Sequence, residues 1–412
     1  MWRQTAAAVV IAFGLGFQPQ ASLAQEIDTR EGTLAAQRAE KARSLKPYEA
    51  GKLERALLWF EDAEPTRKLA PHDGFYLQYG FRWKPVGGGV GMGAGWRHDL
   101  FNRNARAILG GGISTRNYQM LQADFSLPYL VQNRLELGVH AVYRHNPQED
   151  FWGVGIDSSK DDRVSYLVDY TDYEGRAIVR PVSWLEAGTR FGWLVGSVGR
   201  GTDKRFPSIQ DLFTDATAPG LSEQPDFGFG EFFATVDYRD EDDNARAGGL
   251  YSLTWREYSD LDFNRYSFRA VDLLLQQFVP IFDKKRVFAV QGRLQSAATD
   301  EGAGQIVPFY FQPTLGGSTS HRGFNDFRFR DDAVVNVNVE YRWEAFSGLD
   351  MALFSDWGTV ASNIEQLKLS EVQNAYGIGF RFNTFKAVFL RIDIAGGGND
   401  GVHLFIKFSK VF

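Results

Sequence analysis

The chain of 412 residues contains no cysteine and only 6 histidines, and both shortages narrow its chemistry. Without cysteine there can be no disulfide framework, no thiolate metal site and no lipoprotein anchor. The histidines form no H-E-x-x-H zinc motif. A net charge of −6 and a pI near 5.6 argue against a nucleic-acid partner.

No pattern of catalytic residues stands out either. His140 and His145 are five positions apart on an expected strand, so they point to opposite faces and make a poor metal pair. The segment from Gly316 to Ser320 comes closest to a G-x-S-x-G nucleophile elbow but lacks its last glycine. We therefore predict that the protein is not an enzyme and uses no metal or cofactor. A lipase whose Ser–His pair is revealed only by geometry remains an alternative.

The first 24 residues have the three parts of a secretory signal peptide. Arg3 supplies the positive start, and Ala6 to Phe17 form an apolar stretch. Ser22-Leu23-Ala24 then provide a small-residue cleavage site. The apolar stretch is shorter than the roughly 20 residues that a spanning helix needs. We expect an exported protein with a signal peptide over residues 1–24.

Residues 25–72 differ in composition from everything after them. Residues 31–46 and 48–61 are rich in Ala, Leu, Glu, Lys and Arg, which favour helix, and Pro47 separates the two pieces. Apolar residues recur at helical spacing in the second piece: Leu53, Ala56, Leu57 and Phe60. We interpret residues 25–72 as a short helical periplasmic segment. A plug or gating helix is the alternative.

From residue 73 onward the hydrophobic pattern has a period of two. In one clear case Phe191, Trp193 and Val195 share a face, while Arg190 and Gly192 lie on the other. Repeated over more than 300 residues, this alternation is typical of transmembrane strands with an apolar lipid face and a polar lumen. Because only every second residue of a strand faces lipid, the mean hydropathy can be as low as −0.29. The aromatic content of 15% suits aromatic girdles at two membrane interfaces. A soluble β-sandwich would show the same alternation and is the alternative fold.

The pattern predicts an all-β fold: a 16-stranded antiparallel transmembrane β-barrel over residues 73–412. The expected strands are 89–97, 103–112, 117–127, 133–145, 163–180, 184–197, 228–238, 247–258, 262–279, 285–296, 306–314, 333–345, 349–359, 374–383, 387–395 and 401–412. Residues 74–84 also resemble a strand, which leaves the count at 16 or 17. Long polar connections at 146–162, 198–227 and 297–332 alternate with short turns, as in outer-membrane barrels.

Three motifs in the last hundred residues occur in an order that is typical of one family of barrels. The connection 297–332 contains His321-Arg322-Gly323-Phe324, and a later strand reads Phe354-Ser355-Asp356-Trp357-Gly358. Glu340 lies on the strand between them, and the chain ends on a strand with Phe408 and Phe412. This arrangement resembles the bacterial surface antigen superfamily of outer-membrane assembly and translocation barrels. The signature of that family is an Arg-Gly-Phe or Arg-Gly-Tyr tripeptide in the long sixth extracellular loop, followed by F-x-D-x-G on a later strand.

The resemblance implies a location in the bacterial outer membrane and covers about residues 85–412. Two departures stand beside it. Lys410 occupies a position of the final recognition strand that is usually apolar. Most family members also carry polypeptide-transport-associated domains of about 75 residues each before the barrel, and residues 25–72 are too few for one. The chain therefore resembles a shortened branch that lacks these domains.

The Arg-Gly-Phe tripeptide predicts a locked loop. An arginine that reaches into the lumen must be paired, because burying its unpaired charge costs several kcal/mol. Glu340 and Asp356 lie on the polar faces of neighbouring strands, and one planar guanidinium can bridge two carboxylates. Gly323 would allow a tight loop tip, and Phe324 would fill space in the lumen. The resemblance implies that Arg322, Gly323 and Phe324 hold the loop inside the barrel. A solvated surface arginine is the alternative.

Function is predicted from the seam where the first and last strands meet. Glycines weaken residues 89–97 as a strand, so this seam with residues 401–412 would open and offer an edge to an incoming strand. We expect protein insertion or translocation, or lipid handling, at the outer membrane. The expected partners are outer-membrane lipid, lipopolysaccharide and an unidentified client protein, and the barrel would be a monomer. A passive channel is the main alternative, and the lipase is the lesser one.

Overall fold

The computed structural model describes residues 38, 40, 51, 52, 55, 73–80, 88–300, 304–384, 388–398 and 400–407. The chain divides into two units, residues 1–49 and 50–412. In the first unit, the described residues Arg38 and Glu40 are helical. The second unit contains the sheet. Most of the helical segment expected at residues 25–72 lies outside the described residues, as does the expected signal peptide.

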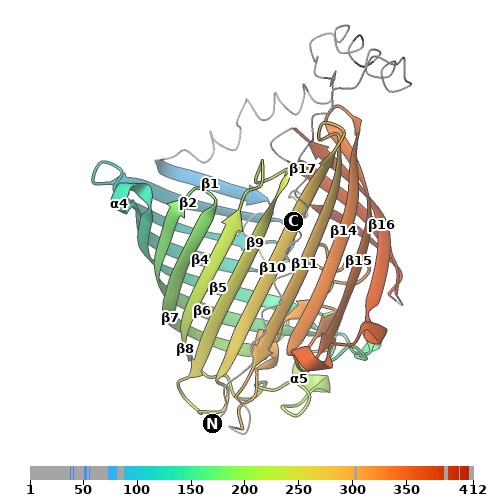
Figure 1. The fold of residues 1–412 in the computed structure, drawn as a ribbon. Helices are drawn as coiled ribbons and strands as arrows, with labels where there is room; N and C mark the ends of the chain where they lie inside the picture. Colours follow the sequence, from blue (N-terminus) through green and yellow to red (C-terminus); the bar gives the residue numbers. More distant parts are fainter. Residues whose placement is uncertain are drawn as a thin grey trace, which may run out of the picture. The chain divides into compact units, whose positions relative to one another are not determined.

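The second unit is a 16-stranded antiparallel β-barrel whose strands follow one another in sequence order (Figure 1). Its strands are β1 (Gly74–Gly80), β2 (Gly91–Leu100), β3 (Ala105–Ser114), β4 (Gln119–Tyr129), β5 (Leu135–Phe151), β6 (Val164–Val182), β7 (Leu185–Arg200), β8 (Phe227–Asp237), β9 (Gly248–Asp260), β10 (Phe268–Ile281), β11 (Arg286–Ala298), β14 (Ala333–Phe346), β15 (Leu349–Ala361), β16 (Gln373–Asn383), β17 (Val388–Gly396) and β18 (Val402–Lys407). Every neighbouring pair is antiparallel, from β1 with β2 to β17 with β18. This confirms the predicted fold class.

Short elements occupy the connections. They are α4 (Leu130–Asn133), η1 (Lys160–Asp162), α5 (Ile209–Leu212), η2 (Phe309–Phe311), η3 (Ile364–Gln366) and η4 (Leu369–Glu371), with a two-stranded ladder of β12 (Thr314–Leu315) and β13 (Phe329–Arg330). Among the described residues, none of the helices has the length and apolar character to cross a membrane.

The two faces of the sheet carry the residues that the alternation predicted. Large apolar side chains such as Phe191, Trp193 and Leu353 are 59%, 58% and 53% exposed, so they form the lipid-facing surface. The opposite face carries buried charges, including Glu231 and Arg381. Because successive side chains of a strand alternate, one sequence pattern places apolar residues toward lipid and ion pairs toward the lumen.

Within the described residues the sheet has 16 strands, but one predicted strand is wrong and the first strand was misidentified. The sheet begins with β1, within the segment 74–84 that we had left open, so the glycine-rich β2 is the second strand and not the first. Residues 306–314 form no barrel strand. Their Phe309–Phe311 is a 3-10 turn that places aromatic rings in the lumen. This aromatic run has strand propensity, but its side chains pack within the loop and against the barrel wall instead of forming a strand.

The connection between β11 and β14 packs inside the barrel. Phe309 is fully buried against Phe151 and Tyr166 of β5 and β6. Farther along, Leu315 and Phe324 are buried with Val334 of β14 and Val360 of β15. One loop therefore contacts strands from both halves of the sheet, which places it in the lumen. We refer to the described residues of this connection, 299–300 and 304–332, as the lumen loop.

Candidate functional site: a buried ion-pair cluster under the lumen loop

The tip of the lumen loop places Arg322 on the inner faces of β14 and β15. Its backbone N–H and its Nε donate to Asp356 Oδ2 at 2.9 and 2.7 Å, and its Nη2 donates to Asp356 Oδ1 at 2.6 Å. Its Nη1 donates to Glu340. All three side chains are at most 1% exposed. A bidentate guanidinium–carboxylate pair of this kind is short, directional and charge-assisted.

Other charges surround this pair. Arg342 Nε and Arg381 Nη2 donate to the two oxygens of Glu340 at 2.7 and 3.1 Å. Arg381 also donates to Asp393 at 2.6 Å. Arg391 Nε lies 3.0 Å from Asp393 Oδ2. We call these seven residues the arginine cluster: Arg322, Arg342, Arg381, Arg391, Glu340, Asp356 and Asp393. It joins the loop to β14, β15, β16 and β17.

Burial alone would lower the pKa of the Arg322 guanidinium, because desolvation disfavours its charge. The carboxylates of Asp356 and Glu340 outweigh that effect and hold the pKa above its ordinary value. The arginine is therefore fully charged in the folded protein, and the loop tip is tied down by charge–charge contacts in a region without water access.

Each of the three specified residues of the F-x-D-x-G motif has a physical role. The Arg322 guanidinium stacks over the ring of Phe354, with Cζ 3.4 Å from its centroid. Asp356 supplies the bidentate carboxylate. At Gly358 a Cβ would lie 2.8 Å from Leu315 of the loop, so the glycine makes room for that side chain. The motif spacing of two places all three residues on the inner face of β15.

The structure gives Gly323 a different role from the one predicted. We expected it to allow a tight turn, but its φ is not among the positive values. A Cβ at Gly323 would instead lie 2.4 Å from the Cβ of Ala375 on β16. The missing side chain therefore permits close approach of loop and strand. Phe324, expected to fill space in the lumen, is 2% exposed and packs edge-on against His321 and Phe329.

Two further arginines anchor the lumen loop and were not anticipated. Arg328 Nε lies 3.2 Å from Asp400, between β17 and β18, and its Nη2 donates to the carbonyl oxygen of Ser158 at 2.7 Å. Arg330 Nη2 donates to the Tyr166 hydroxyl at 3.3 Å. The available signal in the sequence was the run Phe327-Arg328-Phe329-Arg330, which adds two arginines to the connection that already holds Arg322. Arginines drawn into a lumen require partners.

The structure thus brings together Arg322, Glu340 and Asp356, and it places Gly323 and Phe324 beside them. The partners Arg381, Arg391 and Asp393 were not singled out from the sequence, although the alternation had placed them on the polar face. Phe408 and Phe412, predicted as the end of a recognition strand, lie outside the described residues.

Comparison with known proteins decides the family. A family model described as "Omp85 superfamily domain" matches residues 99–400. The chain belongs to the Omp85 superfamily. This outer-membrane family is the one whose resemblance rested on the Arg-Gly-Phe and F-x-D-x-G motifs, so that prediction is confirmed. The location in the bacterial outer membrane follows from the family.

Among solved structures, this Omp85 barrel is similar to BamA from Haemophilus ducreyi lacking POTRA domains 1–3. The TM-score is 0.61 at 17% identity, and the match covers 81% of this chain and 69% of that one. CdiB from Acinetobacter baumannii and CdiB from Escherichia coli each match with a TM-score of 0.48 at 12% identity. These matches cover 82% and 81% of this chain but only 56% and 61% of the CdiB chains. No curated protein sequence matches the chain.

Proposed function

We propose that this Omp85 barrel inserts or translocates a client protein at the outer membrane through the seam between β1 and β18. The observation that carries the proposal is that β1 and β18 are the two ends of the sheet. Within the described residues, β1 is hydrogen-bonded to β2 and β18 to β17, and each occupies an end of the strand order. A strand edge that is weakly paired presents backbone N–H and C=O groups that are a template for an incoming strand.

The lumen loop has a supporting role in the proposal. Arg322 ties the loop to β14–β17, and Arg328 ties it to Asp400 in the β17–β18 connection. The loop therefore holds the last hairpin from inside while the edge of β18 stays available. In this proposal the arginine cluster fixes one wall of the seam, so that opening moves β1 against a rigid β17–β18 side.

Two other functions have less support. A passive channel needs an open lumen, whereas aromatic side chains of the lumen loop, such as Phe309, pack against the barrel wall. We also propose that the barrel is not an enzyme. His321, the histidine nearest the near-elbow sequence Gly316 to Ser320, directs its Nε2 to the carbonyl oxygen of Gln373 at 3.1 Å. In this proposal the barrel acts as a monomer on an unidentified client protein, in contact with outer-membrane lipid and lipopolysaccharide.

Site-specific photo-crosslinking tests the seam. Because β1 and β18 end the sheet, a photoreactive phenylalanine analogue at Leu77 or Leu404 would face lipid beside the seam; these side chains are 56% and 61% exposed. Leu353, 53% exposed on β15, is the matched control away from the seam. We expect protein adducts at Leu77 and Leu404 and none at Leu353. Quantitative outer-membrane proteomics after depletion should show loss of the same client.

Equal adducts at all three positions, or an unchanged proteome with altered solute uptake, would contradict the proposal and favour a passive channel. Changed lipid composition without protein adducts would favour lipid handling.

A further inference from the structure

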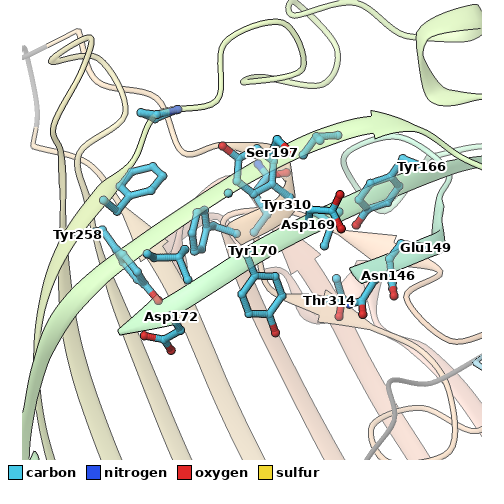
Figure 2. Close-up of a pocket in the computed structure, with 18 of the residues that line it drawn as sticks. Asn146, Glu149, Tyr166, Asp169, Tyr170, Asp172, Ser197, Tyr258, Tyr310 and Thr314 are labelled. Atoms are coloured by element: carbon cyan, nitrogen blue, oxygen red, sulfur yellow. The ribbon is translucent and has the colours of Figure 1, made fainter. Parts of the chain in front are cut away.

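A second site lies in the lumen, apart from the arginine cluster. A cavity of about 440 Å³ lies between β5–β9 and the lumen loop, and none of the seven cluster residues lines it. Figure 2 shows side chains from strands and loop gathered around it, among them Tyr166, Tyr170 and Tyr310. Its size is in the range of cavities that hold small organic molecules.

Aromatic rings form much of the wall. Tyr166 and Tyr170 come from β6, Tyr258 comes from β9, and Tyr310 and Phe311 come from the loop. The Tyr258 and Phe311 rings pack with centroids 4.9 Å apart, and Tyr310 and Phe311 lie 5.2 Å apart. Such a wall offers flat apolar surfaces on which the face of a ring-shaped ligand can stack.

The same cavity holds buried polar atoms that lack partners among the described residues. They are Asn146 Oδ1, Glu149 Oε1, Asp172 Oδ1, Gln312 Oε1, the Tyr310 hydroxyl and Arg330 Nε. Asn146, Glu149 and Gln312 are only 7%, 8% and 7% exposed. Buried polar groups are normally hydrogen-bonded. Apart from Arg330 Nε, each of these atoms is an oxygen that can accept, and the Tyr310 hydroxyl can also donate, so the cavity suits a ligand with several donors.

The charges of the wall favour a neutral ligand. The wall contains three carboxyl groups, those of Glu149, Asp169 and Asp172, and two guanidiniums, those of Arg256 and Arg330. Arg256 is held by Glu231 and the Tyr258 hydroxyl, and Arg330 donates to the carbonyl oxygen of Phe309 at 2.5 Å. An organic cation would meet the two guanidiniums, and an anion would meet the three carboxyl groups. Both therefore pay a repulsion that a neutral molecule avoids.

We propose that this cavity is a binding site for a neutral carbohydrate. A sugar ring presents apolar C–H faces to aromatic walls, while its hydroxyl groups donate to oxygens such as Asp172 Oδ1 and accept from Arg330 Nε. The sugar arrives either as a free oligosaccharide or as part of a surface glycolipid, and the chemistry of recognition is the same. The inference goes beyond the proposed function, because it requires neither a seam nor a client protein.

Calorimetric titration of the full chain in detergent tests the site. The probes are maltotriose, chitotriose and a neutral, phosphate-free outer-core oligosaccharide of lipopolysaccharide, with choline and acetate as charged comparison ligands. Tyr310→Ala removes a ring from the loop, and Asp172→Asn removes an acceptor. The matched controls are Tyr376→Ala on the lipid face and Asp300→Asn in an exposed stretch of the loop. We expect at least one sugar to bind, and the first two variants to raise its Kd about tenfold or more while the controls leave it unchanged.

The outcomes separate cleanly. Binding of a trisaccharide supports a free-sugar site, and binding of the core oligosaccharide alone supports recognition of a glycolipid headgroup. Failure of all three sugars at 10 mM, equal affinity in all variants, or binding of choline or acetate instead overturns the proposal. Each variant is first checked for heat-modifiable gel mobility. Tyr310→Phe, which keeps the ring and loses only the hydroxyl, replaces Tyr310→Ala if that protein does not fold, and is then expected to bind more weakly than the wild type.

Discussion

At the scale of single residues, four guanidiniums share three carboxylates in the arginine cluster. Glu340 receives hydrogen bonds from Arg322, Arg342 and Arg381, so the loss of one leaves two. Asp356 is placed differently, because Arg322 is its guanidinium partner and Asn338 its other side-chain donor, at 2.8 Å. The charge that would suffer most without Arg322 is therefore Asp356.

We predict that Arg322→Ala lowers the free energy of unfolding by about 3–5 kcal/mol, the usual cost of leaving one partner of a buried ion pair alone. The double variant Arg322→Ala/Asp356→Ala should be less destabilised than Arg322→Ala, because the stranded carboxylate is gone. Urea unfolding in detergent or lipid, followed by tryptophan fluorescence, provides the measurement. As a matched control, Arg269→Ala breaks an ion pair whose side chains are 45% and 76% exposed, and should cost about 0–1 kcal/mol. A double variant no more stable than the single one would show that Asp356 is not stranded.

His321 beside Arg322 predicts a pH dependence. Burial lowers the pKa of this fully buried imidazole below its ordinary value of 6.5. Between the lowered folded pKa and the unfolded pKa, the unfolded chain binds a proton that the folded chain does not. Stability contributed by neutral His321 is therefore present above pH 6.5 and is lost as the pH falls below it, by at most about 1.4 kcal/mol per pH unit.

Unfolding of wild type and His321→Phe between pH 7.5 and 5 measures this effect. The wild type should lose more stability than the variant over that range. Parallel pH profiles for the two proteins would show that His321 does not contribute.

At the scale of elements, the lumen loop fits against β15–β17 and the β17–β18 connection because small residues line them where large loop residues lie. Leu315 lies over Gly358, and Phe324 lies where a Cβ at Gly398 would be 2.4 Å from its ring. Gly323 and Ala375 are equally close, because a Cβ at Gly323 would lie 2.4 Å from the Cβ of Ala375. Close packing of this kind cannot absorb even one added methyl group without displacement, because protein interiors are dense.

We predict that Gly323→Ala destabilises the barrel by about 1–3 kcal/mol through overpacking against Ala375. The second-site change Ala375→Gly should restore part of that loss, because it removes the atom that the new Cβ meets. Both singles and the double variant are compared by urea unfolding. Additive effects of the two changes would contradict direct contact between the residues.

At the scale of the whole molecule, the lumen is filled in two places by one loop. Its aromatic residues Phe309 and Phe311 pack against β5–β9, and Arg322 with Phe324 packs against β14–β17. A barrel of this size would otherwise enclose water, and the interior of such barrels is either an aqueous path or closed by loops. The loop therefore both braces the wall and obstructs the lumen.

We predict a low conductance for the wild-type barrel in planar lipid bilayers. Replacing residues 317–327 by a short Gly-Ser linker should raise the conductance several-fold, because it removes Arg322 and Phe324 from the lumen while keeping the β12–β13 ladder. Replacing the exposed residues 364–366 by the same linker is the control and should leave the conductance unchanged. Equal conductance of wild type and the loop variant would contradict an obstructing loop.

Much of this architecture was readable from the sequence, and the errors have physical reasons. The alternation identified the two faces of the sheet, since it repeats a strict period of two. Strand identity was less secure: residues 306–314 have strand-like composition but bury their rings in the lumen, while β1 replaced them in the count. Aromatic residues favour both strands and tertiary clusters, and only packing decides between them.

The sequence by itself determined the barrel class and the outward and inward faces, which follow from local periodicity. The expected pairing of Arg322 with Glu340 and Asp356 came from the resemblance to the surface antigen superfamily, together with the rule that a buried charge needs a partner. Only the tertiary structure decided that Arg342, Arg381 and Arg391 join the same cluster, and that Gly323 is small because of Ala375. Those contacts join segments far apart in the chain, so they depend on the register and curvature of the whole sheet, which no local pattern encodes.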